Sequence, residues 1–596
     1  MSRETQTNSK NLGQYFTPYD VARFMCSLIS KKSGAKILEP CAGKGVFLKV
    51  LENLGFHNVT AYEIDRMLNN ESKTTIHPQN FLTVNRHNRY DVIVGNPPYV
   101  RWKNIPKGIQ KELKNNEYWQ EKMNGLSDLL YAFIQLSIDL LNDGGELIFI
   151  TPVFWMETQH SKALRKYMSS NGELEYIIDF NEMPIFDRVS SNIIIFKYVK
   201  RKTGNPVKVV HLRSKKKLSN DILDEISTVL KKLEKKGDAS GDFIDAYLHP
   251  QFSNGAPWKP IPPKIKPVLD AIEASCTNSH FFVRVKLADK EISVPLSRML
   301  EDDDLEKFGI HKDLCVRVSF LDKKYYMVKQ RSITANDDLA KRYIKLGDIA
   351  EIANGMVSGL DRAFKTDQKD TFEKNEKTKF IPVIKASALR QFSTGRPVQY
   401  IFANDVEHEN ELKENYPNIF HHLSHFKSDL GKRYDYGRPI KWWHWAFLRN
   451  KTLIEKSHEK ILVPCKERID TKGYIRFAYA EGEVYATQDV TSIVKKRYVK
   501  EDARYILALL NSKVILTWIK HKGLNRGGVT EFSEKPLSII PIRLINWDDR
   551  NEVKVHDEIV KLATNIIETN EFDKNMPQIE EYVEMLYGVK NLTCKI

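Results

Sequence analysis

The chain has 596 residues, of which 41% are hydrophobic and 28% charged; this balance excludes a disordered or fibrous protein, and the length predicts about two to four domains. Lys and Arg number 92 against 77 Asp and Glu, a formal net charge of +15, which favours a polyanionic partner, nucleic acid first, although a generally Lys-rich proteome would give the same balance. The six cysteines are scattered without metal-ligand spacing, so we expect reduced thiols and no metal site. The N-terminus is polar and no uncharged run could span a bilayer, so we expect a cytoplasmic protein that is neither exported nor membrane-embedded.

The first predicted element is a capped helix in GQYFTPYDVARFMCSLI. Thr17 is a natural N-cap residue, and Pro18 is favoured at the first helical position. Apolar residues follow at helical spacing and predict a core face. They are Val21, Phe24, Met25 and Leu28.

From there to about residue 198, short β-rich runs alternate with amphipathic helices. The runs are AKILEP, VTAYEID, YDVIVGN, ELIFIT, LEYIIDF and NIIIFKYV. This alternation predicts a doubly wound α/β sheet. The last two runs have too little chain between them for a crossover helix, so we expect an antiparallel hairpin at one edge of the sheet.

The first strand leads into a small-residue turn, CAGKG, which includes Ala42 and Gly43 and lets backbone N–H groups approach a ligand. The third glycine of the dinucleotide fingerprint is absent, and the strand ends in Glu39, which would repel a pyrophosphate but suit a cation. The second strand ends with Glu63, where an acid can bind a ribose diol. Ribose and positive charge without phosphate indicate S-adenosylmethionine rather than NAD.

The third strand ends in Asn96, Pro97, Pro98 and Tyr99. The side-chain carbonyl of Asn96 and the backbone carbonyl of Pro97 could together hold both N–H groups of an exocyclic base amine and direct its lone pair at a methyl sulfonium. Proline keeps such a loop rigid, and Tyr99 offers a π-face to a base pulled out of a duplex. Read alone, the four residues are also compatible with an ordinary turn after a strand.

Beyond residue 199 the sequence changes character. A Lys-rich stretch followed by Gly-Asp-Ala-Ser-Gly predicts a domain junction, and we place the domains at 1–215, 216–343 and 344–596. Residues 258–343 receive no function, although VRVSFLDKKYYMVKQ predicts a hairpin and SRMLEDDDLEKF a solvated loop or short helix. The last part combines short strands and basic loops with a helical tail.

In this last part, cations alternate with aromatic residues. Cations can neutralise phosphates or read guanine, and aromatic rings can stack or wedge between bases. The candidates for DNA contact are Lys432, Arg433, Arg438, Lys441, Trp442, Trp443 and, in HKGLNRGGVTEF, Arg526. The aromatic stripe, which continues to Trp445, is equally compatible with a core.

Together these segments resemble the γ-class, Taq-type DNA adenine-N6 methyltransferases, closely over about residues 11–198 and more loosely from about residue 345 to the end. The resemblance implies a Rossmann-like class I methyltransferase sheet, a C-terminal mixed α+β DNA-recognition domain, S-adenosylmethionine as donor and a flipped adenine in duplex DNA as acceptor. It also implies a protein associated with the nucleoid.

The resemblance also assigns roles to individual residues. Thr17 would close over the cofactor, Glu39, Ala42 and Gly43 would border its methionine, and Phe186 would hold the flipped adenine against Tyr99. Glu63 and Ile64 would hold the ribose and adenine of the cofactor, and Asn80-Phe81 stands where the family has an acid and an aromatic residue. The change to Asn80 removes a charge from the expected cofactor contact.

Several other functions share parts of this pattern. Enzymes that methylate a release-factor glutamine also carry Asn-Pro-Pro-Tyr, an RNA base-amine methyltransferase is the main alternative, and a catalytically idle DNA reader is a third. The segment before Thr17 is too short for a fused nuclease. We therefore expect a monomeric methyltransferase of a restriction–modification system or an orphan regulator, with any cognate endonuclease acting separately.

Overall fold

The computed structural model divides the chain into two compact units, residues 1–266 with 525–529, and residues 267–524 with 530–596. It describes residues 15–589 except 124–127, 182, 187–191, 214–215, 238, 240, 242, 254, 279–281, 288–289, 296–314, 321–322, 329–342, 367–370, 497–498 and 527–528. In this part of the chain, no helix is both long and apolar enough to cross a membrane.

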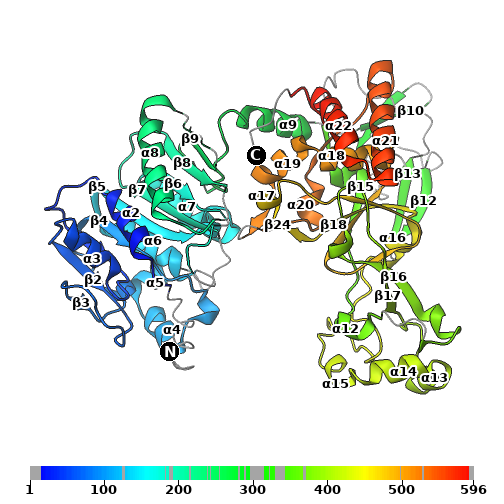
Figure 1. The fold of residues 1–596 in the computed structure, drawn as a ribbon, viewed down its shortest axis with the longest axis horizontal. Coiled ribbons are helices and arrows are strands. Elements are labelled where there is room, and N and C mark those ends of the chain that lie inside the picture. The colour runs from blue at the N-terminus through cyan, green and yellow to red at the C-terminus, as the bar shows by residue number, and fades with distance from the viewer. Residues whose placement is uncertain are drawn as a thin grey trace. The chain divides into compact units, whose positions relative to one another are not determined.

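The first unit is built on a nine-stranded sheet with the order β3-β2-β1-β4-β5-β7-β6-β8-β9 (Figure 1). In that order the strands are β3 (Ile76–His77), β2 (Val59–Tyr62), β1 (Ile37–Glu39), β4 (Tyr90–Gly95), β5 (Leu141–Pro152), β7 (Ile193–Val199), β6 (Glu173–Asp179), β8 (Val207–Leu212) and β9 (Ile244–His249). The strands from β3 to β5 run parallel, which confirms the predicted doubly wound sheet.

The pairing of β6 with β7 is antiparallel, as the sequence predicts, but its position differs from the prediction. Strand β7 inserts between β5 and β6, and β8 and β9 extend the sheet beyond β6. The pair is therefore inside the sheet and not at its edge. The compact first unit extends past the predicted boundary at residue 215, because α8 (Asn220–Lys236) and β9 belong to it.

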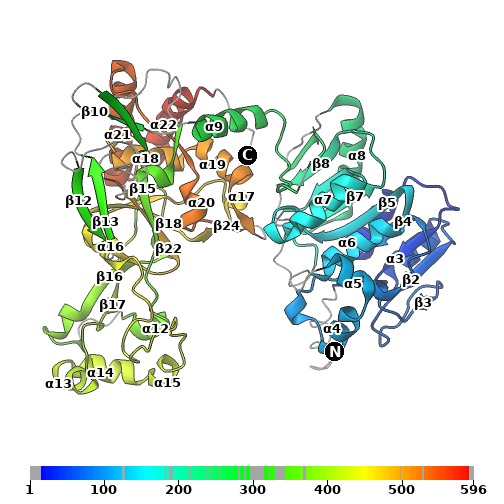
Figure 2. The ribbon, with the colours of Figure 1, turned by 180° about the vertical axis from the view of Figure 1, so that it is seen from behind.

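Helices cover both faces of this sheet. Buried residues of α2 (Tyr19–Ser27), α3 (Val46–Asn53) and α8 form a core with one face. The other face packs against α6 (Leu129–Leu140) and α7 (Lys162–Asn171), with α4 (Lys107–Lys114) and α5 (Glu117–Lys122) contributing (Figure 2). Four short 3-10 turns complete the unit: η1 (Phe81–Thr83), η2 (Trp102–Asn104), η3 (Val153–Met156) and η4 (Gln159–Ser161).

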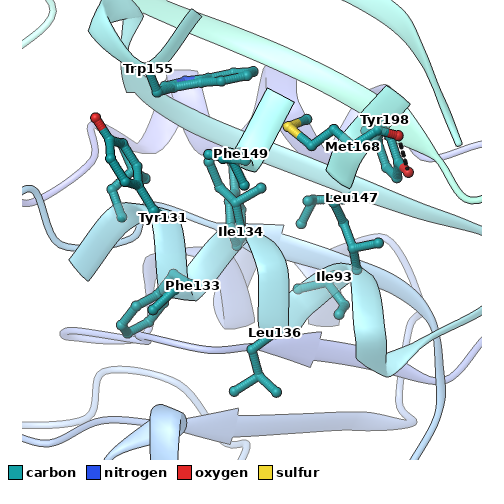
Figure 3. Packing of buried hydrophobic residues seen from close by; sticks show 14 of the residues in the cluster. Ile93, Tyr131, Phe133, Ile134, Leu136, Leu147, Phe149, Trp155, Met168 and Tyr198 are labelled. Atoms are coloured by element: carbon teal, nitrogen blue, oxygen red, sulfur yellow. Dashed lines mark hydrogen bonds between the residues drawn. The ribbon is translucent and has the colours of Figure 1, made fainter. Parts of the chain in front are cut away.

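Helix α6 is apolar almost all around, and it is buried along nearly its whole length. Figure 3 shows it lying over the sheet, with Ile134 beside Phe149 of β5, and Ile93 of β4 and Leu147 of β5 in the same core. Nearby, the Tyr198 hydroxyl donates a hydrogen bond to the Met168 carbonyl at 3.0 Å, which links β7 to α7. This core fixes the position of the strand ends that carry the candidate site.

The second unit is mixed α+β, as predicted. Its largest sheet is antiparallel, with the order β15-β22-β18-β20, and a smaller sheet has the order β17-β16-β21. The described strands from residue 267 onward are β10 (Phe282–Leu287), β11 (Lys290–Pro295), β12 (Cys315–Phe320), β13 (Lys323–Val328), β14 (Tyr343–Lys345), β15 (Ala350–Asn354), β16 (Phe380–Ile384), β17 (Val398–Ile401), β18 (Glu459–Pro464), β19 (Lys466–Glu467), β20 (Ala478–Glu481), β21 (Tyr485–Ala486), β22 (Val490–Lys495), β23 (Asn525–Arg526), β24 (Val529–Glu531) and β25 (Pro541–Arg543). Antiparallel pairing of β12 with β13 confirms the hairpin predicted in residues 316–330, whereas SRMLEDDDLEKF lies outside the described residues.

The helices of the second unit include the predicted helical tail. They are α9 (Lys266–Asn278), α11 (Leu346–Ile349), α12 (Asp361–Phe364), α13 (Glu409–Asn415), α14 (Pro417–Ser424), α15 (Lys427–Leu430), α16 (Lys451–Lys456), α17 (Ile469–Lys472), α18 (Ala503–Asn511), α19 (Lys513–Lys522), α20 (Glu534–Ser538), α21 (Arg550–Thr569) and α22 (Phe572–Tyr587), with 3-10 turns η7 (Glu376–Lys379) and η8 (Ala386–Ala388). One hydrophobic core lies among α12, α14, β16 and β17, and it contains Trp443 and Trp445.

Candidate active site

A cavity opens in the first unit where β1, β2 and β4 end, with an empty volume of about 810 Å³ that includes its mouth. This is a usual ligand position in open α/β sheets. Residues that line the cavity come from the chain before α2, the turn after β1, and the loops after β2 and β4. They include Phe16, Gly43, Glu63, Ile64, Asn80 and Asn96.

The turn after β1 brings the backbone to the cavity wall. Gly45 precedes α3 with a φ of +84°, and a Cβ there would come within 2.8 Å of Asn70 Oδ1, so this position requires glycine. Glu63 Oε2 accepts a hydrogen bond from Gly43 N at 2.8 Å, which ties this turn to the end of β2. Burial raises the pKa of the Glu63 carboxyl. Glu63 also lines the cavity.

Glu39 is completely buried behind Pro40 and Cys41, which line the cavity. Neither of its carboxyl oxygens has a hydrogen-bond partner among the described residues. Burial, and secondarily the charge of Glu63, raise its pKa well above the usual range for Glu. A buried carboxyl without a partner is costly to ionise, which agrees with the direction of this pKa shift.

The other residues predicted to bind the cofactor lie around the same cavity, except Ala42 and Thr17, which do not line it. Ile64, Asn80 and Phe81 line it, but Ala42 is buried in a small cluster with Leu48 and Ala61 and serves packing. Asn80 is already engaged, because Oδ1 accepts from Leu82 N at 3.1 Å and Nδ2 donates to Glu112 Oε2 at 3.2 Å.

The Asn96-Pro97-Pro98-Tyr99 loop begins directly after β4, and Asn96 and Pro98 line the cavity. Asn96 Nδ2 donates to the Tyr15 carbonyl at 2.7 Å and to Thr17 Oγ1 at 3.1 Å. The Tyr99 hydroxyl contacts Asn96 Oδ1 and lies 2.9 Å from the Ile150 carbonyl. The side-chain amide is therefore held from both sides. Thr17 does not cap α2, because Pro18 occupies the cap position and α2 begins at Tyr19.

Three residues that the sequence left without a role contribute to this site. The Cys41 thiol donates to the Asn96 carbonyl at 3.0 Å, and burial raises the pKa of that thiol, which keeps it protonated. Phe16 lies over Gly43, where a Cβ would stand 3.7 Å from its ring, and Tyr15 contacts Tyr99 and Phe186. The only available signal was the aromatic pair before Thr17 in GQYFTP.

The predicted DNA-contact residues of the second unit fall into two groups. Lys432 and Arg438 are exposed and available to a ligand. Lys441 pairs with Glu407, Trp442 is half-buried and packs against the core, and the side chain of Arg526 lies outside the described residues.

Arg433 and Trp443 are used inside the protein. The Arg433 guanidinium donates to the carbonyls of Ser358 at 2.7 Å, Leu430 and His444 at 2.8 Å, and Trp442 at 3.0 Å. Its desolvation lowers its pKa to about 10. Trp443 is 5% exposed and donates to the Val406 carbonyl. We therefore withdraw both residues from the predicted DNA surface.

Comparison with known families agrees with this organisation. Residues 22–186 match the family described as Eco57I restriction-modification methylase, and residues 403–542 match the TaqI-like C-terminal specificity domain. The type II methyltransferase M.HindII of Haemophilus influenzae (strain ATCC 51907 / DSM 11121 / KW20 / Rd) is 37% identical over 94% of this chain and 95% of its own, and M.HincII of Haemophilus influenzae is 36% identical over the same shares.

A solved structure of the type IIL restriction-modification enzyme MmeI in complex with DNA shares the fold, with a TM-score of 0.51, 11% identity, and coverage of 99% of this chain and 74% of that chain. The relatives cover nearly the whole chain at more than a third identity, and the matched families fall on the two units described above. The chain belongs to the type II DNA methyltransferases of restriction–modification systems, with a methylase domain followed by a TaqI-like specificity domain.

Proposed function

We propose that this protein transfers a methyl group from S-adenosylmethionine to N6 of an adenine flipped out of duplex DNA, as the modification enzyme of a restriction–modification system. The observation that carries the proposal is that Asn96 and Pro98 of the Asn96-Pro97-Pro98-Tyr99 loop line the same cavity as Glu63 and the turn after β1. An amine-binding loop and a candidate cofactor pocket then share one space. The RNA alternative does not fit a relative of DNA methyltransferases.

The residues around the cavity fit the proposed cofactor. Glu39 is a buried carboxyl without a partner among the described residues, which suits a ligand with positive charge, and Glu63 offers carboxylate oxygens to a ribose diol on the cavity wall. Phe16 and Thr17 would cover it from the N-terminal side. When bound, S-adenosylmethionine supplies a methyl group activated by its sulfonium.

The chain's own contribution is to orient a weak nucleophile. The Asn96 side-chain carbonyl and the Pro97 backbone carbonyl each accept a hydrogen bond from one N–H group of the amine. This favours sp³ character at N6 and directs the N6 lone pair at the methyl group. The N–CH₃ bond forms as the S–CH₃ bond breaks, and one N6 proton leaves to water. For this step Asn96 Oδ1 exchanges its contact with the Tyr99 hydroxyl for the amine. Tyr99 and Phe186 then stack on the base.

The first test is expression in a host that lacks DNA methylation, followed by sequencing that separates N6-methyladenine from N4-methylcytosine at single-base resolution. One fully modified adenine motif is expected. Modified cytosine would refute the adenine assignment, because the same pair of carbonyls would also serve the cytosine amine. No modified base, with cofactor still bound, would refute DNA base methylation by this protein.

The matched variants are Asn96→Ala and Asn53→Ala, the latter at the exposed end of α3. Asn96→Ala should lower methyl transfer by at least about a hundredfold, since it removes an acceptor used at the reacting nitrogen. Normal methylation by Asn96→Ala would refute the role of Asn96.

We further propose that the enzyme acts as a monomer and that a separate endonuclease recognises the same DNA sequence.

A further inference from the structure

The ring of Tyr15 contacts both of the rings that we assign to the flipped base. It stacks on Tyr99 with centroids 5.7 Å apart and an interplanar angle of 20°, and its centroid lies 6.0 Å from that of Phe186 at 42°. Tyr15 is 41% exposed, so its ring is at the surface and not part of the buried core. An aromatic side chain therefore fills a slot flanked by aromatic rings.

The backbone of the same residue occupies the polar side of the slot. The Tyr15 carbonyl accepts the 2.7 Å hydrogen bond from Asn96 Nδ2, and Thr17 Oγ1 accepts a second one. A flipped base would use the same ring contact, but its amine would bind the other atom of this amide, Asn96 Oδ1. The N-terminal segment thus accepts both hydrogen bonds of the Asn96 amide nitrogen.

We propose that Tyr15 is a removable substitute for the flipped base: its ring keeps the slot between Tyr99 and Phe186 closed to water and leaves when the target base enters. This inference rests on the proposed function. The contact between two stacked aromatic rings is weak enough to be exchanged for a contact with a base. Because this contact must first break, base flipping should be about two- to tenfold slower than with an empty slot.

The test uses the full-length enzyme and duplexes with 2-aminopurine at the methylated position, whose fluorescence rises on flipping. Tyr15→Ala and Tyr15→Leu should both speed flipping by about two- to tenfold, because neither side chain stacks like tyrosine. Tyr15→Phe, which keeps the ring, should behave as wild type. Tyr19→Ala is the matched control, because Tyr19 is also exposed and bonds Asn53 instead.

Unchanged or slower flipping in both Tyr15→Ala and Tyr15→Leu, with cofactor affinity retained, would overturn the inference. A wild-type enzyme that gives no flipping signal at the target base would overturn the proposed function instead, so the two failures are distinguishable.

A second, independent observation concerns the loop between α15 and α16. Tyr434 (74% exposed) packs edge-to-face on Tyr436 (42%) at 4.8 Å, and Tyr436 stacks on Phe447 (37%) at 5.1 Å. We call these three residues the aromatic column. Tyr436 adopts a φ of +54°, a conformation that costs a tyrosine energy and is held only when the surroundings impose it.

On the same loop, the Arg433 guanidinium binds the backbone carbonyls of four residues. Its Cδ would lie 2.7 Å from a Cβ at Gly359, where φ is +82°, so only glycine permits this approach. The loop is therefore fixed while its rings stay in solvent. Large exposed apolar patches of this kind mark interaction sites.

The charges beside the column favour a polyanion. Lys432 and Arg438 are exposed on the same loop, while its Asp435 carboxylate accepts from Gly437 N at 3.0 Å and turns back onto the loop. The residues lie within the match to the TaqI-like specificity domain. We infer that the aromatic column inserts between base steps of duplex DNA and contributes to sequence recognition by this DNA methyltransferase.

The test compares Tyr434→Ala/Tyr436→Ala with Tyr474→Ala, an exposed tyrosine in another loop. The double variant should bind the motif found by sequencing about tenfold or more weakly and discriminate less against other sequences, with an unchanged salt dependence, because rings release no counterions. Wild-type affinity and discrimination in the double variant would overturn the inference. A wild type that methylates no DNA would refute the proposed function instead.

Discussion

We expect Glu39 to make cofactor binding and folding depend on pH in opposite senses. Its pKa is raised in the folded protein, mainly by burial, so folding favours the neutral carboxyl. The contribution of this carboxyl to the free energy of unfolding is therefore fully present at low pH and is lost as pH rises through the raised pKa. A cationic ligand prefers the ionised form, so we expect the affinity for S-adenosylmethionine to increase as pH rises through the same pKa.

Glu39→Gln should therefore flatten the pH dependence, weaken cofactor binding by about tenfold or more, and raise the melting temperature of the ligand-free protein at neutral and alkaline pH. Calorimetric titrations and melting curves across pH measure both effects. An unchanged pH profile in Glu39→Gln would show that another group controls binding.

Cys41 positions the catalytic loop through one hydrogen bond to the Asn96 backbone. Cys41→Ala removes the donor and should lower kcat by about fivefold, the equivalent of roughly 1 kcal/mol, with little change in cofactor affinity. Cys41→Ser keeps a donor and should restore most of kcat. Equal rates for Cys41→Ala and wild type would mean that the loop is held without this thiol.

Residue type alone did not reveal which cations are available to DNA. Arg433 and Arg438 look alike in the sequence, yet one donates to carbonyls around its loop while the other is exposed. The roles of Tyr15 and Arg433 depend on residues far away in the chain, and local patterns carry no such information. Asn96 and Glu63 could be predicted, because each directly follows a recognisable strand.

At the level of elements, apolar runs predicted the strands around the cavity but not the full sheet. Strand β8 lies in VKVVHL, where Lys208 and His211 interrupt the apolar pattern close to a Lys-rich stretch, so the segment was interpreted as a junction. Strand order is also set by long-range packing, and neither the insertion of β7 nor the addition of β9 has a local signal.

Strand β7 carries a buried ion cluster that holds its neighbours together. Lys197 is 1% exposed, lies 3.5 Å from Glu146 on β5 and 3.1 Å from Glu175 on β6, and donates to the Leu28 carbonyl at 2.9 Å. Lys197→Met leaves Glu146 buried without its cation and should cost about 3 kcal/mol in the free energy of unfolding.

Chemical denaturation measures this loss. The control is Lys49→Met, which breaks the exposed pair with Glu71 and should cost no more than about 1 kcal/mol. A loss in Lys197→Met as small as that in the control would show that the cluster contributes no more than a surface pair.

At the scale of the whole molecule, the proposed function divides catalysis and DNA recognition between the two units. The cavity belongs to the first unit, and the exposed cations Lys432 and Arg438 belong to the second. With a net charge of +15, the protein should bind DNA with an affinity that falls steeply with salt, whereas methyl transfer at saturating DNA should not.

The division of roles predicts separable kinetic defects. Lys432→Ala/Arg438→Ala should raise KM for DNA and reduce the slope of log affinity against log salt by up to about 0.9 per lost phosphate contact, with kcat unchanged. Asn96→Ala should lower kcat and leave DNA affinity and its salt slope intact, because this residue acts on the amine only. Lys561→Ala, an exposed lysine on α21 that pairs with Glu558, is the control. A fall in kcat without a change in KM or slope for the double variant would mean that these cations act on the chemistry, and that the two units do not divide the work in this way.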